Sequence, residues 1–111
     1  MAHQIRIYTT PTLSFRVKDR DLTEFDHIYI TISDHTGSRV LTKQDEELTA
    51  TTDGDDTLVS VTLTQAETKI FRPKTHGSVE INCTNSSGSV RPATEIYDVI
   101  FADNLLKEIK P

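Results

Sequence analysis

The sequence predicts a single all-β domain in which two sheets stack face to face. The chain has 111 residues, which is enough for one domain and too few for two. Apolar and polar side chains alternate with a period of two along most of the chain, and this is the period of a strand buried on one face. Turn-forming residues separate the alternating runs about every ten residues, as in a sandwich of short strands.

The clearest strands are segments in which every second residue is apolar and mostly β-branched. Such side chains suit a pleated surface that is half buried. These segments are residues 5–8, 13–18, 28–33, 59–63 and 79–84. Two shorter strands are expected at residues 39–42 and 47–51.

The last expected strand, about residues 93–101, has a less regular pattern. Within it, Ile96 and Ile100 point to the side opposite Val99 and Phe101. Apolar residues on both faces indicate either a strand that is covered on both sides or a strand with a bulge. The sequence leaves these two interpretations open.

The connections between the strands carry recognisable turn chemistry. Pro11 separates the first strand from the second, because the residue before a proline is restricted. Residues 34–37 and 85–88 have the composition of tight turns. Residues 52–55 contain Asp-Gly, which is the strongest short hairpin signal in this chain.

One segment between the strands, residues 63–71, has the pattern of a short helix. Thr64 can cap its first turn, and Glu67, three residues later, completes a capping box. Pro73 prevents the helix from continuing, and Phe71 is expected to face the core. The complete pattern predicts an immunoglobulin-like antiparallel β-sandwich of seven to eight strands with one short crossover helix between the sheets.

The sandwich is expected to occupy residues 1–102, followed by an apolar tail at residues 103–111. The tail carries Leu105, Leu106 and Ile109 at helical spacing, although so short a segment does not form a stable isolated helix. It is more apolar than a solvated terminus needs to be. We therefore expect it to dock, either on an adjacent subunit or along a sheet edge of its own domain.

The charge and composition exclude several kinds of partner. The formal net charge is -5 and the sequence has no Lys/Arg cluster, so nucleic acid is not an expected partner. No apolar run approaches the roughly 18 residues of a membrane span. The N-terminus lacks the basic and apolar regions of a signal peptide, which predicts folding in the cytoplasm of the producing cell. A single cysteine, Cys83, excludes an internal disulfide framework.

No group of residues has the spacing of a catalytic, cofactor-binding or metal site. Residues 53–56 form an acidic cluster that could bind calcium, but a hairpin turn explains its Asp and Gly residues better. The acidic run at residues 45–47 is interpreted as a solvated loop. The histidines are dispersed, at His3, His27, His35 and His76. The sequence therefore predicts a protein that is not an enzyme and needs no cofactor.

Three further features of the sequence could be functional signals: Cys83, two N-x-[ST] matches and Tyr29. Cys83 continues an apolar strand face, so it is expected to be a small buried side chain rather than a nucleophile. The N-x-[ST] matches at Asn82 and Asn85 are interpreted as chance, because no signal peptide is present. Tyr29 lies opposite the apolar face of its strand and could be exposed. It is therefore a candidate contact residue.

The order of several short motifs resembles that of a known group of phage proteins. The motifs are Thr-Thr-Pro-Thr at 9–12, Asp-His-Ile-Tyr-Ile-Thr at 26–31, Val-Glu-Ile-Asn at 79–82 and Ile-Tyr-Asp-Val at 96–99. The Leu-Thr-Gln-Ala-Glu-Thr segment at 63–68 is the most specific of them. The chain resembles small structural proteins of prophages in Gram-positive bacteria. It is also similar to the immunoglobulin-like N-terminal domain of phage baseplate upper proteins.

This resemblance implies a virion structural protein in the tail or baseplate, or a capsid accessory protein. Such a protein would be made in the cytoplasm of the bacterial host, and its partners would be other virion proteins and further copies of itself. Candidate interface residues are Leu105, Leu106, Ile109 and Tyr29. The alternative function is a carbohydrate-binding or other ligand-binding module that uses its loops or Tyr29.

Overall fold

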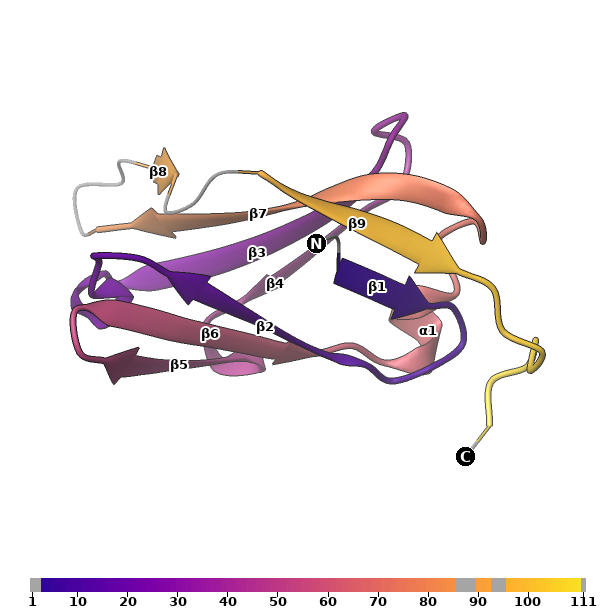
Figure 1. Ribbon diagram of the computed structural model, residues 1–111, viewed down its shortest axis with the longest axis horizontal. Coiled ribbons are helices and arrows are strands. Elements are labelled where there is room, and N and C mark those ends of the chain that lie inside the picture. Colours follow the sequence, from indigo (N-terminus) through magenta and orange to yellow (C-terminus); the bar gives the residue numbers. More distant parts are fainter. Residues whose placement is uncertain (1–2, 86–89, 93–95, 111) are drawn as a thin grey trace.

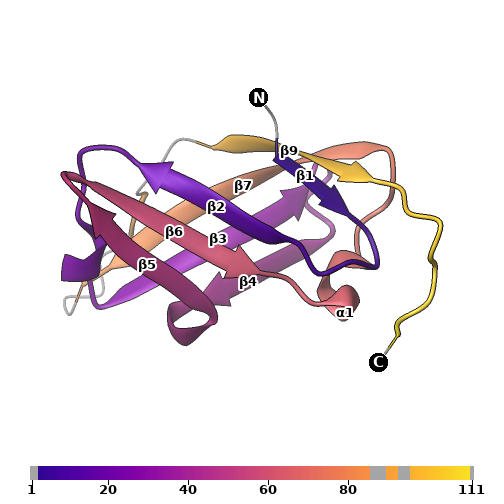
Figure 2. The same ribbon diagram turned by 60° about the horizontal axis from the view of Figure 1, so that its bottom comes forward.

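Two sheets stack face to face in the computed structural model, which describes residues 3–85, 90–92 and 96–110. Figures 1 and 2 show the smaller sheet lying against one face of the larger. The larger sheet contains β1 (His3–Arg6), β9 (Tyr97–Ala102), β7 (Thr75–Thr84), β3 (His27–Asp34) and β4 (Val40–Gln44), in that order, with the short β8 (Val90–Pro92) also paired to β7. The smaller sheet contains β2 (Thr12–Val17), β6 (Asp56–Thr62) and β5 (Leu48–Asp53).

This strand order confirms the predicted fold class, an immunoglobulin-like β-sandwich. The order β9-β7-β3-β4 corresponds to strands G-F-C-C′ of the variable-type immunoglobulin fold, and β2-β6-β5 corresponds to B-E-D. The pairing differs from the prediction at one place among the described strands, because β1 runs parallel to β9. The three-residue β8 was not predicted. The predicted turn at residues 85–88 extends beyond the described residues, as does the second N-x-[ST] match.

The short helix forms where the capping pattern predicts it. Helix α1 (Gln65–Thr68) connects β6 of one sheet with β7 of the other. The Thr64 side chain accepts a hydrogen bond from the Glu67 backbone N–H, and the Glu67 carboxylate accepts one from the Thr64 N–H. Both halves of the capping box are therefore present. Phe71 is buried after the helix, as expected, and its ring stacks on Phe101 with centroids 4.2 Å apart.

The apolar side chains that alternate along the strands fill the space between the sheets. Ile30 and Ile32 of β3 and Val79 and Ile81 of β7 are fully buried. These residues pair directly across the two strands, Ile30 with Ile81 and Ile32 with Val79. Cys83 continues this buried row, as predicted. Because each partner faces the same layer, one row of side chains fixes the register of both strands.

Residues 93–95 of the last predicted strand lie outside the described residues. For its described part, residues 96–101, the interpretation as a strand covered on both sides, or bulged, is wrong. Val99 and Phe101 are buried against the other sheet, whereas Ile96 and Ile100 are 63% and 37% exposed. The register of β9 is continuous with both β7 and β1, so no bulge interrupts it. Ile100 is exposed because nothing in the described chain covers the outer face of the larger sheet.

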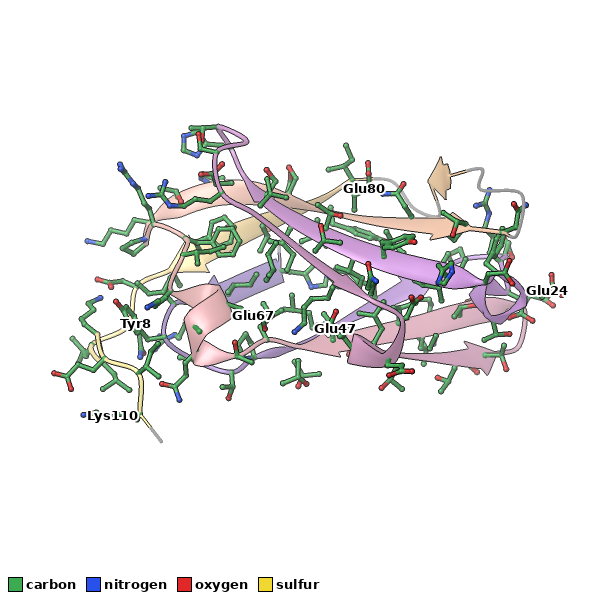
Figure 3. The ribbon with its side chains drawn as sticks, turned by 180° about the vertical axis from the view of Figure 1, so that it is seen from behind. Tyr8, Glu24, Glu47, Glu67, Glu80 and Lys110 are labelled. Atoms are coloured by element: carbon green, nitrogen blue, oxygen red, sulfur yellow. The ribbon has the colours of Figure 1, made fainter. Side chains whose placement is uncertain are left out.

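A partly buried ion pair connects β4 with α1. Lys43 lies on β4, at an edge of the larger sheet, and its side chain points inward with only 7% of the residue exposed. Its Nζ is 2.7 Å from a Glu67 carboxylate oxygen and 3.3 Å from Glu47 Oε2. Glu67 and Glu47 are labelled in Figure 3. An inward charge on an edge strand also hinders pairing with another sheet.

The hydrogen bonds of this ion pair shift the pKa values of both groups more than burial does, and in the opposite direction. Burial acts to raise the pKa of Glu67, but hydrogen bonds from Lys43 and Thr64 bring that pKa below its ordinary value. Burial acts to lower the pKa of Lys43, and its hydrogen bonds to Glu67 and Glu47 raise that pKa above its ordinary value. The charged forms of both side chains are therefore favoured in the folded protein.

Replacing Gly77 with alanine is expected to destabilise the fold. A Cβ at this inward-facing position of β7 would overlap the backbone oxygen of Ser33 and the ring of Phe101. We expect a loss of about 1–3 kcal/mol in the free energy of unfolding, measured by urea denaturation, because the packed layer must shift. Ser78→Ala, on the adjacent outward-facing position, is the control and should change the stability by less than about 0.5 kcal/mol. Equal effects of the two substitutions would contradict this account of Gly77.

Replacing Glu67 with glutamine removes its ion pair with Lys43 but keeps its hydrogen bond in the helix cap, so it distinguishes the effects of the two interactions. An amide oxygen can still accept the Thr64 hydrogen bond, but Lys43 loses its closest carboxylate. We expect a loss of about 1–3 kcal/mol at pH 7, whereas the exposed Glu24→Gln should have little effect. Because the folded pKa of Glu67 is depressed, its contribution exists above its unfolded pKa and disappears as the pH falls through the folded pKa. Urea titrations should show a smaller cost at pH 3 than at pH 7, and a cost of equal size at both pH values would contradict this account.

Candidate functional site

The chain leaves the sandwich after β9 as an irregular arm, residues 103–110 (Figure 1). No helix forms in this arm. Leu105 is 100% exposed, and Leu106 and Ile109 are 40% and 48% exposed. The arm therefore presents three large apolar side chains to solvent.

Polar contacts fix the path of the arm without burying these side chains. The Gln65 side chain of α1 donates to the Lys110 backbone oxygen and accepts from the Lys110 N–H, both at 2.8 Å. Asp103 and Lys107 form an ion pair within the arm. These contacts hold the arm beside α1, so its apolar side chains are displayed from a defined place on the molecule.

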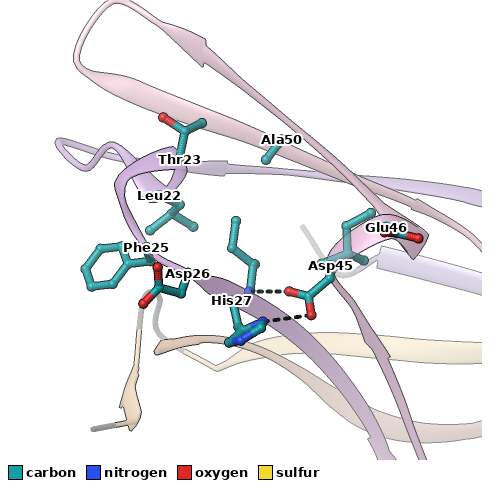
Figure 4. A pocket seen from close by; sticks show the side chains of 10 residues that line it. Leu22, Thr23, Phe25, Asp26, His27, Asp45, Glu46 and Ala50 are labelled. Atoms are coloured by element: carbon teal, nitrogen blue, oxygen red, sulfur yellow. Dashed lines mark hydrogen bonds and ion pairs between the residues drawn. The ribbon is translucent and has the colours of Figure 1, made fainter. Parts of the chain in front are cut away.

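A pocket of about 440 Å³ lies at the other end of the sandwich (Figure 4). It is bounded by the 3-10 turns η1 (Leu22–Glu24) and η2 (Asp45–Glu47), the start of β3 and the inner side of β5. Its apolar lining comes from Leu22, Phe25, Ile28, Leu48 and Ala50, and its polar lining from Thr23, Asp26, His27, Asp45 and Glu46. The arrangement is an apolar depression with carboxylates around it.

The wall of this pocket is braced by Asp45. One of its carboxylate oxygens is 2.9 Å from Nδ1 of His27, and the other accepts the Ile28 N–H at 3.2 Å. Asp45 also has a positive φ of 51°, a conformation that aspartate tolerates better than most residues. These bonds tie η2 to β3 and leave Asp26 and Glu46 exposed at the rim.

The structure does not bring the four predicted interface residues together. Tyr29 lies half-buried on the outer face of the larger sheet, beside Asn82 and Gln44 on the neighbouring strands. Ile100, near the base of the arm, pairs with His76 on β7. The six positions from His76 to Asn82 correspond to about 20 Å along a strand. Tyr29 is thus remote from Leu105, Leu106 and Ile109.

The acidic cluster at residues 53–56 is a hairpin turn, as the sequence predicts. It joins β5 to β6, and Gly54 has the positive φ of 63° that such a turn requires. Arg16 bridges Asp53 and Asp56 at 2.7 and 2.9 Å. The Asp19 N–H and Arg16 lower the pKa of Asp56 below its ordinary value. These carboxylates are therefore neutralised by the protein's own groups.

The other candidate groups remain dispersed in space. Across the part of the chain that the structure describes, no three His, Cys, Asp or Glu side chains come together as metal ligands. His27 bonds Asp45, whereas His3 packs on Phe15 with ring centroids 4.6 Å apart. The predicted loop at residues 45–47 forms the single turn η2.

Comparison with known proteins identifies no relative of this chain. A scan against protein-family models finds no match, and searches of curated proteins and of solved structures find no significant match. No helix within the described residues is long and apolar enough to cross a membrane. Functional inference therefore depends on the arm, the pocket and the sequence resemblance.

Sequence patterns do not reveal the pocket. Its lining comes from separated parts of the chain, which meet only because η1 and η2 both lie next to the start of β3. Leu48 and Ala50 are recognisable as the inward side of a strand, but nothing local shows that they remain partly uncovered. The arm, in contrast, is visible directly as apolar residues beyond the last strand.

Replacing Gln65 with alanine should release the end of the arm without unfolding the domain. Both hydrogen bonds to Lys110 are lost, whereas the Thr64–Glu67 capping box remains. We expect lower heteronuclear NOE values at residues 107–110 and a stability change within about 0.5 kcal/mol. Gln4→Ala, on exposed strand β1, is the matched control. Unchanged NOE values in the Gln65 variant would show that Gln65 does not hold the arm.

Proposed function

We propose that this chain is a non-enzymatic structural module of a bacteriophage virion. Its place would be the tail or baseplate, or the capsid surface as an accessory protein, after synthesis in the cytoplasm of the bacterial host. Its partners would be other virion proteins and further copies of itself. The observation that carries this proposal is the apolar arm, with Leu105 fully exposed beyond a closed, well-packed domain.

The arm supports an assembly function because apolar side chains displayed in this way gain free energy when another surface covers them. The sandwich behind the arm is a rigid base, so docking of the arm would position the whole domain. The motifs at residues 9–12, 26–31 and 63–68 add the virion context through their resemblance to phage structural proteins. The fold alone does not indicate a virion protein, because β-sandwiches serve many functions.

The pocket favours a second candidate function, the binding of a carbohydrate or another small ligand. Its volume of about 440 Å³ falls within the range of small-molecule sites. Phe25 is the aromatic residue in its lining and is half-buried, so the pocket offers a sugar ring little stacking surface. This favours assembly over carbohydrate binding. A glycan array probed with the full chain separates the two functions, since assembly predicts no selective binding.

Particle incorporation tests the assembly function. Phage particles purified from a lysate of the host should contain the full chain by mass spectrometry. A chain lacking residues 103–111 should be incorporated at least about tenfold less, because the covered apolar area is lost. The control Thr49→Ala, an exposed substitution on β5, should be incorporated normally. Absence of the full chain from particles, or equal incorporation of the shortened chain, would contradict the proposal.

A further inference from the structure

Charged side chains are segregated along the longest axis of the molecule. One end holds η1 and the β5–β6 turn, because the Leu22 N–H bonds Thr57 just after that turn and the Asp26 N–H bonds Thr84 at the end of β7. Carboxylates outnumber cations there. The acidic side chains at this end are Asp19, Asp21, Glu24, Asp26, Asp53, Asp55 and Asp56, and the basic ones are Arg16, Lys18 and Arg20. The turn η2 lies nearer the middle of the molecule, at the start of β5 (Figure 3).

At the opposite end cations outnumber carboxylates. The cations are Arg39, Lys69, Arg72, Lys74, Lys107 and Lys110, and the carboxylates are Asp34, Glu67, Asp103 and Glu108. This end holds the β3–β4 turn, α1, the start of β7 and the arm, and Figure 3 shows Lys110 and Glu24 at opposite ends of the molecule. Arg39 and Arg72 line a depression of about 280 Å³ there, and neither forms an ion pair with another described residue. The arm adds Lys107 and Lys110, each paired only with a carboxylate of the arm itself.

The arm and the pocket are complementary in both polarity and charge. The arm places a cation directly after its apolar side chains, Lys107 after Leu106 and Lys110 after Ile109, and it also carries Asp103 and Glu108. The pocket has an apolar lining, and Asp26 and Glu46 at its rim are exposed carboxylates that form no ion pair with a described residue. Burial of the arm's leucines in this pocket would place its lysines beside the rim carboxylates.

The two leucines of the arm cannot reach the pocket of their own domain. The arm begins after Ala102, next to Phe101, which pairs with Thr75 on β7. The pocket adjoins His27, which pairs with Thr84 at the other end of β7. Those nine positions correspond to about 30 Å along the strand. Leu106, four residues beyond Ala102, reaches at most about 14 Å even when fully extended, so another molecule must supply the leucines that fill the pocket.

We propose that copies of this chain join head to tail, with the arm of one copy docked in the acidic-rimmed pocket of the next. The proposal rests on the proposed assembly function and names its partner, a second copy. The contact joins two different surfaces, so repetition gives a closed ring or an open filament according to the rotation between copies. The basic end around Arg39 and Arg72 faces the acidic end of the next copy, which steers the encounter.

Paired charge reversals test this contact in the full chain. The rim variant carries Asp26→Lys and Glu46→Lys, and the arm variant carries Lys107→Glu and Lys110→Glu. Each variant alone presents like charges on arm and pocket, so each should remain monomeric in sedimentation velocity at concentrations where the unchanged chain associates. In an equimolar mixture, each arm again meets a pocket of opposite charge. The weight-average mass of the mixture should return to within about twofold of that of the unchanged chain.

The control variant carries Glu80→Lys and Asp98→Lys on the outer face of the larger sheet. It has the same net charge as the rim variant and should associate like the unchanged chain. Raising the salt concentration from about 0.05 to about 0.5 M should weaken association, because screening reduces the attraction between the ends. Circular dichroism of each variant verifies that the fold is retained.

Two results would overturn the head-to-tail contact. One is an unchanged chain that stays monomeric up to about 1 mM, a concentration at which even a very weak specific contact is half occupied. The other is association that persists in the rim variant and the arm variant alike. Either result leaves particle incorporation as a separate test of the assembly function, so failure of the contact and failure of that function are distinguishable.

Discussion

The layer of apolar side chains shared by the two sheets is the constraint on which the rest of the molecule depends. Each strand contributes every second side chain to this layer, and Ile30, Ile32, Val79 and Ile81 are completely buried in it. A shift of one residue in any strand would turn its apolar side chains to solvent. Gly77 shows how closely the layer is filled, since even one added carbon would overlap Phe101.

This packing separates the two functional features of the molecule. Because the layer holds β3, β7 and β9 in one register, the start of β3 and the end of β9 lie at opposite ends of the sandwich. The pocket lies at the first of these places and the arm begins at the second. Because the leucines of the arm cannot reach the pocket of their own domain, we propose that arm and pocket meet between two molecules.

Local patterns were sufficient to predict most of the fold. Alternation located the long strands, Asp-Gly located the β5–β6 hairpin, and Thr64 with Glu67 located α1. Non-local features were not predictable in this way. The parallel pairing of β1 with β9 joins the two ends of the chain, and no local signal distinguishes parallel from antiparallel partners.

The candidate site likewise has parts that the sequence predicts and parts that depend on contacts between distant segments. The arm could be predicted, because Leu105, Leu106 and Ile109 follow the last strand without a partner in the sequence pattern. Tyr29 was correctly placed opposite the apolar face of its strand, but its half-burial depends on neighbours from β4 and β7. The exposed Ile100 had suggested a covered strand, because a sequence shows that a side chain is apolar and not whether anything lies over it.

Burial of the arm by a second copy is tested most directly by a mixed-label NMR experiment. Unlabelled chains carrying a spin label at Glu108→Cys, where the native Cys83 is buried, are mixed with ¹⁵N-labelled chains that carry no spin label. Only contacts between copies can then broaden the observed signals. The account predicts broadening of the amides of Leu22, Ile28 and Ala50 around the pocket. Broadening elsewhere on the sandwich, or none at a concentration where the chains associate, would contradict it.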